Sequence, residues 1–112
     1  MTPQIIAHRG ASYLAPENTL TAFKKAMEIG ADGVEMDVQQ TIDAGLVIHH
    51  DYMIDLHTDI SGKIYDMTMG DLKELDFGSW KGPEYAGEQI PTLEEVLSLI
   101  HISEPTRLGM IS

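Results

Sequence analysis

The 112-residue sequence predicts an α/β domain that contains a parallel sheet element. The first observation is the order of its apolar patterns. Short runs typical of strands stand at residues 4–7, 33–38 and 46–48, with a helical pattern between the first two. A strand, helix, strand order is typical of parallel pairing. The second observation is that clusters of histidine, arginine and carboxylates follow these runs, which indicates functional residues at strand ends.

A polar loop separates the first strand from the predicted helix. Pro16 disfavours helix in the residue before it, and Asn18 or Thr19 can cap a helix through a side-chain oxygen. Apolar residues then recur at helical spacing, namely Leu20, Phe23, Ala26 and Met27. Gly30 supplies a helix stop, so we expect one helix with an apolar face between Thr19 and Gly30.

The second strand places two carboxylates on one face. Its apolar residues alternate with Glu35 and Asp37, and a strand turns successive side chains to opposite faces. Residues 39–45 are too few for a helical crossover, which takes about a dozen or more residues. The chain therefore either returns extended or forms a hairpin. We favour the extended return, because it would bring His50 to the same rim as Asp37.

The segment after His50 reads as an insertion over residues 51–92 of a domain spanning residues 1–96. It begins as a polar loop with a turn at Ser61-Gly62, and Thr68 opens a capping box before a short helix. Residues 77–89 read as an ordered loop. A second capping box begins at Thr92.

Composition narrows the classes of function. The 18 acidic and 7 basic residues give a net charge of −11, which argues against nucleic-acid binding because that depends on Lys and Arg. An anionic substrate would need local compensation, which Arg9 and a divalent cation could supply. The sequence has no cysteine, and we see no signal peptide and no apolar stretch that could span a bilayer. We therefore expect a cytoplasmic protein without a stable membrane anchor.

Four polar clusters carry the candidate chemistry. They are His-Arg-Gly at 8–10, Pro-Glu-Asn-Thr at 16–19, Glu-Met-Asp at 35–37 and His-His-Asp at 49–51. A phosphate ester needs its charge neutralised, a nucleophile deprotonated and a leaving group protonated, and arginine, a hard cation and a histidine pair can do this. Buried carboxylates are costly without a cation or partner, which also favours a metal.

These clusters, in this order, resemble the glycerophosphodiester phosphodiesterase family over about residues 4–96. The resemblance implies a TIM-type barrel, of which this chain would be an N-terminal fragment with about three of the eight strands and the site at the C-terminal rim. The resemblance implies that His8 and His50 act as the acid and the base. It also implies that Arg9 binds the phosphate and that Glu35 and Asp37 bind Mg²⁺ or Ca²⁺. Glu17 and Asn18 are further candidates for substrate binding, with helix capping as the simpler alternative.

The implied reaction begins with attack by a glycerol hydroxyl on the phosphodiester. Water then opens the cyclic phosphate, giving glycerol 3-phosphate and an alcohol. Two departures from the family pattern stand out. Leu56 and His57 stand where the family usually has Arg-Thr within an Asp-Arg-Thr-Thr run, and the later strand that supplies a third metal carboxylate has no counterpart here. We expect His49 to be structural, and the pattern assigns no role to His57.

The C-terminal residues suggest a different origin. Residues 97–107 read Leu-Ser-Leu-Ile-His-Ile-Ser-Glu-Pro-Thr-Arg, which is the translation of a transposase-type sequencing adaptor. The adaptor's later ATC TCG translates to Ile111-Ser112. We therefore expect the natural coding sequence to have been cut near Val96 and residues 97–112 to be a non-native tail. A divergent natural C-terminus is the alternative.

Two other functions remain open. One is a barrel phosphodiesterase that acts on lipid or lysophospholipid diesters. The other is a fragment without function of its own, since missing strands leave open sheet edges. We expect the activity to belong to the parent protein, meaning the longer protein that completes the barrel, and this chain by itself to be inactive. The sequence does not predict an oligomeric state.

Overall fold

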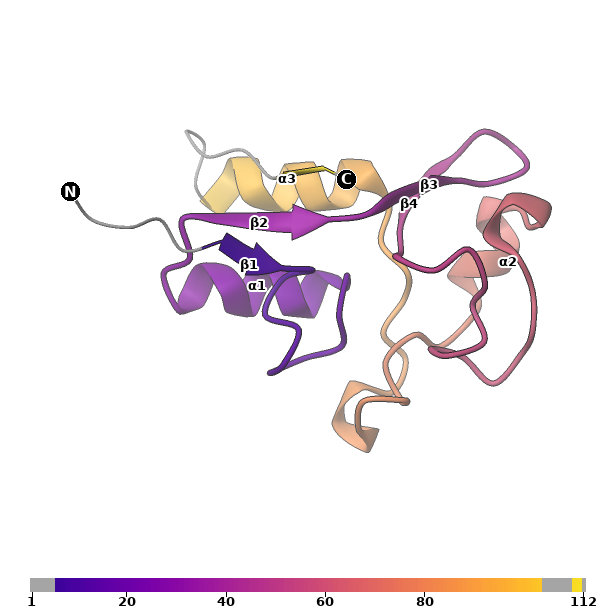
Figure 1. Cartoon of the computed structure of the whole chain (residues 1–112), viewed down its shortest axis with the longest axis horizontal. Coiled ribbons are helices and arrows are strands. Elements are labelled where there is room, and N and C mark those ends of the chain that lie inside the picture. The colour runs from indigo at the N-terminus through magenta and orange to yellow at the C-terminus, as the bar shows by residue number, and fades with distance from the viewer. Residues whose placement is uncertain (1–5, 104–109, 112) are drawn as a thin grey trace.

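The computed structural model describes residues 6–103 and 110–111, with side chains for residues 6–100. Three strands form a parallel sheet in the order β1-β2-β5: β1 (Ile6–His8), β2 (Gly33–Met36) and β5 (Met110–Ile111). A second sheet pairs β3 (Val38–Gln40) with β4 (Leu46–Ile48). Helices α1 (Leu20–Glu28) and α3 (Leu93–Ser103) lie along the parallel sheet (Figure 1). Between β4 and α3 come α2 (Met69–Lys73) and the 3-10 turns η1 (Ile64–Asp66) and η2 (Pro83–Tyr85).

The predicted strand, helix, strand unit is confirmed. β1 and β2 are parallel with His8 opposite Glu35, and α1 connects them. Thr19 is the N-cap of α1, and its side-chain oxygen accepts a hydrogen bond from the Ala22 amide. The first two residues of the predicted strand at 4–7 lie outside the described residues. This unit sets His8 at the carboxyl end of β1, beside the acidic face of β2.

The favoured extended return after the second strand is wrong. β3 and β4 form an antiparallel hairpin in which Val38 faces Ile48. The Thr41 amide donates to the Gly45 carbonyl at 2.8 Å and the Thr41 hydroxyl accepts from the Gly45 amide at 2.8 Å. A link too short for a crossover therefore satisfies its backbone groups locally.

The hairpin also divides the strand predicted at residues 33–38. β2 ends at Met36 and β3 begins at Val38, so Asp37 stands at the point where the chain leaves the parallel sheet. The His49 amide donates to the Asp37 carbonyl at 2.9 Å. The hairpin thus brings His49 beside Asp37 by cross-strand pairing, so the reason for favouring an extended return disappears.

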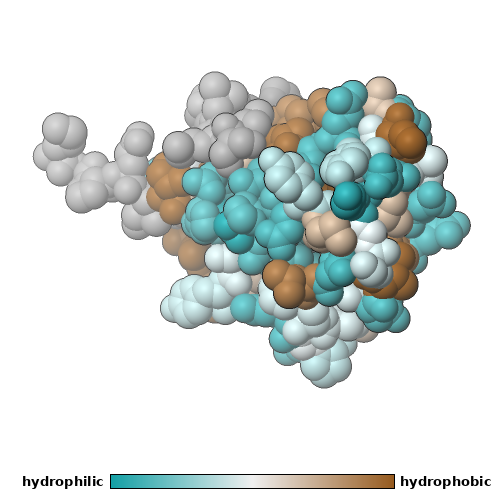
Figure 2. All heavy atoms as spheres, turned by 45° about the vertical axis from the view of Figure 1, so that its right-hand side comes forward, coloured by the Kyte–Doolittle hydropathy of each residue, from teal (hydrophilic) through white to brown (hydrophobic). Residues whose placement is uncertain are grey.

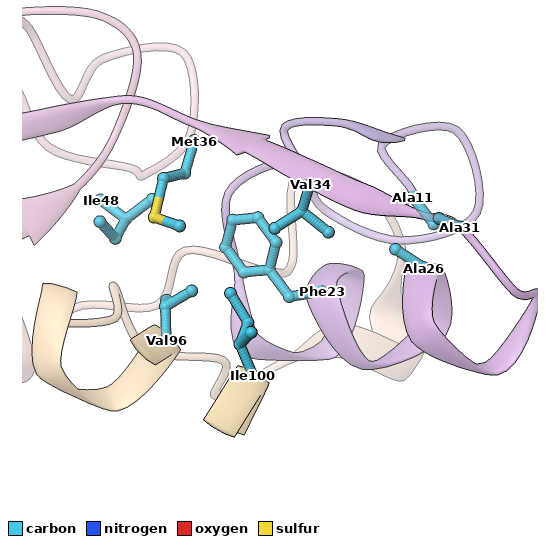
Figure 3. Packing of buried hydrophobic residues seen from close by; sticks show 9 residues of the cluster. All are labelled: Ala11, Phe23, Ala26, Ala31, Val34, Met36, Ile48, Val96 and Ile100. Atoms are coloured by element: carbon cyan, nitrogen blue, oxygen red, sulfur yellow. The ribbon is translucent and has the colours of Figure 1, made fainter. Parts of the chain in front are cut away.

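Two separate groups of buried apolar residues form the interior. The first, the barrel core, lies between α1, β2, β4 and α3, with Phe23 pointing among its members (Figure 3). Val34 and Met36 are buried in it while Glu35 is half-buried, which confirms the predicted alternation over residues 34–36; it does not extend to Val38, which is half-buried in β3. Its members are Ala11, Phe23, Ala26, Ala31, Val34, Met36, Ile48, Val96 and Ile100.

The second group, the insertion core, lies under the segment that follows the hairpin. Its buried members are Val47, Ile54, Ile64, Leu72, Phe77 and Ile90. The predicted caps shape the helices of this region. The Thr68 oxygen accepts from the Asp71 amide, and Thr92 and Glu95 exchange hydrogen bonds between side chains and amides. The segment thus has buried apolar residues of its own.

Helix α3 continues across residue 97, with Val96 and Ile100 both in the barrel core. The helix therefore shows no break at the expected start of the tail, whose origin stays a prediction. Figure 2 shows hydrophobic surface in separate patches between hydrophilic residues on the face presented there. Among the helices of the described residues, none combines the length and the apolar character needed to cross a bilayer.

Candidate active site

The end of β1 and the loop after it place His8 beside Glu35 of β2 and Arg9 beside Asp37, which follows β2. His8 Nε2 lies 2.9 Å from Glu35 Oε1, and the His8 side chain is exposed. Arg9 and Gly10 both have left-handed backbone, with φ of 55° and 79°. The backbone N–H of Asn18 closes the loop by donating a hydrogen bond to the Arg9 carbonyl at 2.9 Å. The backbone of the His-Arg-Gly cluster is therefore fixed against the start of α1.

Gly10 is required at this turn for a steric reason as well. A Cβ on Gly10 would lie 2.8 Å from the Ala22 carbonyl carbon of α1, closer than real contacts allow. The loop that carries Arg9 therefore packs directly against α1 at Gly10.

Arg9, Glu17, Asn18 and Asp37 come together in one polar network. Arg9 Nη1 donates to Glu17 Oε2 at 2.8 Å, and Arg9 Nε lies 3.5 Å from Asp37 Oδ2. Asn18 is buried in a left-handed conformation with φ of 57°, and its Nδ2 donates to Asp37 Oδ2 at 3.1 Å. Thr19 rather than Asn18 is therefore the cap of α1, and the Asn18 side chain joins the polar network instead.

His50 has its own carboxylate partner. Its Nδ1 lies 2.8 Å from Asp51 Oδ1, and this hydrogen bond is the main cause that lowers the pKa of the Asp51 carboxyl. Gln39 Nε2 donates to the carbonyls of three successive residues, at 3.0, 3.0 and 2.6 Å: His49, His50 and Asp51. The hairpin strand β3 thus fixes the backbone that carries His50.

The structure groups the predicted residues around two neighbouring acidic positions. His8 contacts Glu35, while Arg9 and Asn18 contact Asp37. His50 lines a hollow of about 690 Å³, whose wall includes Asp37. Within the side chains that the structure describes, no three His, Asp or Glu residues converge on a common metal position. Glu35 and Asp37, the carboxylates expected to bind metal, instead have different partners, His8 for Glu35 and Arg9 with Asn18 for Asp37.

His57 is a residue near this network that the sequence interpretation missed. Its side chain is 8% exposed, and its Nε2 lies 3.8 Å from Glu17 Oε2. Its ring meets those of His49 and Trp80 edge-on, at centroid distances of 4.8 and 4.6 Å. Burial is the main cause that lowers the pKa of His57 and brings that of His49 to about 4. A single loop histidine carries no periodic signal, so only its departure from the family pattern drew attention to it.

Comparison with known proteins identifies the family. The model of the glycerophosphoryl diester phosphodiesterase family matches residues 8–107. The chain belongs to this family.

Relatives and solved structures agree. A glycerophosphodiester phosphodiesterase of Caldanaerobacter subterraneus subsp. tengcongensis is 52% identical, over 89% of this chain and 41% of the relative. The structure of an Oleispira antarctica phosphodiesterase in complex with the product sn-glycerol-3-phosphate matches with a TM-score of 0.87 at 48% identity, over 90% of this chain and 41% of that one. That of an Agrobacterium tumefaciens glycerophosphodiester phosphodiesterase matches with a TM-score of 0.88 at 31% identity, over 98% and 46%.

These matches confirm the predicted fold class, part of a TIM-type barrel. The chain spans about two fifths of the length of the Caldanaerobacter relative.

Proposed function

We propose that the parent protein is a metal-dependent phosphodiesterase that hydrolyses glycerophosphodiesters to glycerol 3-phosphate and an alcohol. The observation that carries this proposal is the pairing at the end of two parallel strands. His8 ends β1 and Arg9 follows it, and each lies against a carboxylate at or just after β2, Glu35 at 2.9 Å and Asp37 at 3.5 Å. An imidazole, a guanidinium and two carboxylates thus lie at one rim of the sheet. Phosphoester hydrolysis requires such groups for proton transfer, for binding the phosphate and for binding a metal ion.

The residues at this rim fit a hard divalent cation. Glu35 and Asp37 offer carboxylate oxygens, which Mg²⁺ and Ca²⁺ prefer. The Asn18 amide adds a buried oxygen, Oδ1, that has no hydrogen-bond partner among the described residues, although its Nδ2 contacts Asp37. Glu35 and Asp37 would hold the cation, which when bound neutralises charge on the phosphate. A further carboxylate from the remainder of the barrel would complete the site.

The chain's own side chains supply proton transfer and phosphate binding. A glycerol hydroxyl attacks phosphorus while one histidine takes its proton. The bond to the alcohol oxygen breaks, and the other histidine protonates that oxygen. Water then opens the cyclic phosphate with the proton transfers reversed. Asp51 at 2.8 Å favours the His50 tautomer with the proton on Nδ1, which leaves Nε2 free to accept one. Arg9 binds a phosphate oxygen, and Glu17 and Asn18 complete its surroundings.

A second candidate, a diesterase for lysophospholipids, is favoured by one feature of the hollow. Beside His50 its wall includes Tyr52, Met53 and Leu56, and the first and last are 73% and 74% exposed. An alcohol group with an acyl chain could cover this apolar surface. Leu56 matters most, because the family pattern expects arginine there.

The experiment is to assay the parent protein with Mg²⁺ or Ca²⁺ on two substrates, a glycerophosphodiester with a small alcohol and a lysophospholipid. Release of glycerol 3-phosphate from the first supports the proposal, and hydrolysis of the second alone supports the alternative. The Leu56→Arg variant is the matched control. It should lower activity on a lysophospholipid and leave the small diester within about twofold. No hydrolysis of either substrate would refute both functions.

A further inference from the structure

The Glu17–His57 pair lies behind Arg9 and is not explained by acid–base or metal chemistry. Glu17 Oε2 accepts a hydrogen bond from Arg9 Nη1 at 2.8 Å and lies 3.8 Å from His57 Nε2. Glu17 lies in the loop between β1 and α1, whereas His57 belongs to the segment after the hairpin, so the pair joins two parts of the chain. We propose that Glu17 and His57 are positioning residues that hold the Arg9 guanidinium where it meets the substrate phosphate. This inference rests on the proposed role of Arg9.

The guanidinium of Arg9 is held chiefly by Glu17, whose Oε2 accepts a hydrogen bond from Nη1. Asp37 Oδ2 adds an ion pair 3.5 Å from Nε, although Nε makes no hydrogen bond among the described residues. The Arg9 side chain is 21% exposed, and its backbone is fixed by the hydrogen bond from the Asn18 amide. Arginine loses considerable rotamer freedom when it is held in this way, so a preformed pairing lowers the entropic cost of phosphate binding.

His57 keeps Glu17 in place without competing for its charge. Its ring is enclosed by His49 and Trp80, and its Nδ1 is buried with no hydrogen-bond partner among the described residues. A proton on Nδ1 would lack an acceptor there, which favours the tautomer with the proton on Nε2, the atom that faces Glu17 at 3.8 Å; burial lowers the pKa of His57 and so favours the neutral ring. The charge of Glu17 is therefore left to Arg9.

Glu17 matches the family pattern, whereas His57 departs from it. Glu17 belongs to the Pro-Glu-Asn-Thr cluster, whereas His57 stands where the family usually has threonine. A threonine is shorter than histidine and would not place a donor near Glu17 while also filling the space between the two aromatic rings. We therefore expect this chain to hold Glu17 partly through packing from the insertion.

The Glu17→Gln variant separates positioning from simple charge. If Glu17 acted only through its charge, its removal would strengthen phosphate binding, because one negative charge near the anion is lost. If it positions Arg9, its removal weakens binding. The two explanations predict opposite signs.

The experiment measures binding of inorganic phosphate to the parent protein by calorimetry, and turnover of a glycerophosphodiester in parallel. We expect Glu17→Gln to weaken phosphate binding about tenfold and His57→Thr about threefold, with KM rising by similar factors, since a small displacement of a binding group can cost that much or more. The His57→Gln variant retains a side-chain N–H donor and should recover part of the loss. Glu28→Gln, at an exposed position of α1, is the matched control and should change neither quantity.

Equal or stronger phosphate binding by a folded Glu17→Gln variant would overturn the proposal. If that variant does not fold, unchanged binding and KM in His57→Thr would overturn the part played by His57, and Glu17→Asp would then test the carboxylate. The phosphate measurement needs no turnover. A parent protein that binds phosphate but hydrolyses no diester would refute the proposed function and leave this inference open to the same comparison.

Discussion

Replacing Gly10 by alanine in the parent protein should damage both the fold and the site, because two costs meet at this residue. Its φ of 79° is a left-handed conformation, which costs an L side chain about 1–2 kcal/mol. The new Cβ would also lie 2.8, 2.9 and 3.0 Å from the carbonyl carbon, Cβ and carbonyl oxygen of Ala22. Two of these three atoms belong to helix backbone, so the loop or α1 must move, and overpacking of this kind typically costs about 1–3 kcal/mol.

Gly30 offers a matched control that carries only the first cost. Its φ is 82°, but a Cβ there would have no neighbour within 4 Å. We expect Gly30→Ala to lower the free energy of unfolding by about 1–2 kcal/mol and Gly10→Ala by about 2–5 kcal/mol. The difference between the two variants isolates the steric cost of the close approach to α1.

Urea unfolding followed by circular dichroism measures both free energies. Gly10→Ala should also lower turnover, because movement of the loop displaces Arg9, while Gly30→Ala should not. A Gly10→Ala variant that is no less stable than Gly30→Ala would refute the reasoning from the close approach. Full stability combined with lost turnover would show that the loop moves alone and α1 does not.

The other predictions concern catalysis, metal, completeness and pH. In the parent protein, His8→Ala and His50→Ala should each lower kcat at least ~10²-fold with little change in KM, and near wild-type turnover in either steady-state assay would remove that histidine from the acid–base pair. Chelation should abolish activity and Mg²⁺ or Ca²⁺ should restore it, while Asp37→Asn should raise the metal concentration required; full activity in excess chelator would exclude the metal. The 112-residue chain should show no measurable activity when its release of glycerol 3-phosphate is assayed beside the parent protein. Two carboxylates alone would hold the cation and the phosphate poorly. Activity within tenfold of the parent would contradict this expectation. Burial holds the pKa of His49 at about 4, below the ordinary value of about 6.5. The unfolded chain therefore binds the proton first, and folding stability is lost as the pH falls from about 6.5 to about 4. Urea titrations should show a loss of about 3 kcal/mol over this range, and the His49→Phe variant should not show it.

Local chemistry explains which parts of the fold the sequence could predict. The alternation around Glu35, the cap at Thr19 and the boxes at Thr68 and Thr92 each depend on neighbours within four residues, and the structure confirms them. The hairpin was not the favoured prediction, because the choice between an extended return and a hairpin depends on pairing between residues ten apart, such as Val38 with Ile48.

The candidate site likewise has a part that the sequence could predict and a part that it could not. The residue types at the strand ends indicated phosphoester chemistry, and the structure brings Arg9, Asn18 and Asp37 into contact. Their catalytic and binding roles stay predictions. The contact of His57 with Glu17 joins residues 40 positions apart and lies beneath aromatic rings, so no local pattern could have indicated it.

The separation of the two groups of buried residues has an evolutionary consequence. Among the described residues, the insertion core and the barrel core have no buried member in common. Substitutions under Tyr52, Met53 and Leu56 can therefore reshape the wall of the hollow without opening a void beside Phe23 or Met36. Selection on the wall of the hollow could act on the segment that follows β4 while the strands that carry His8 and Glu35 stay unchanged. New specificities would then arise at little risk to the scaffold.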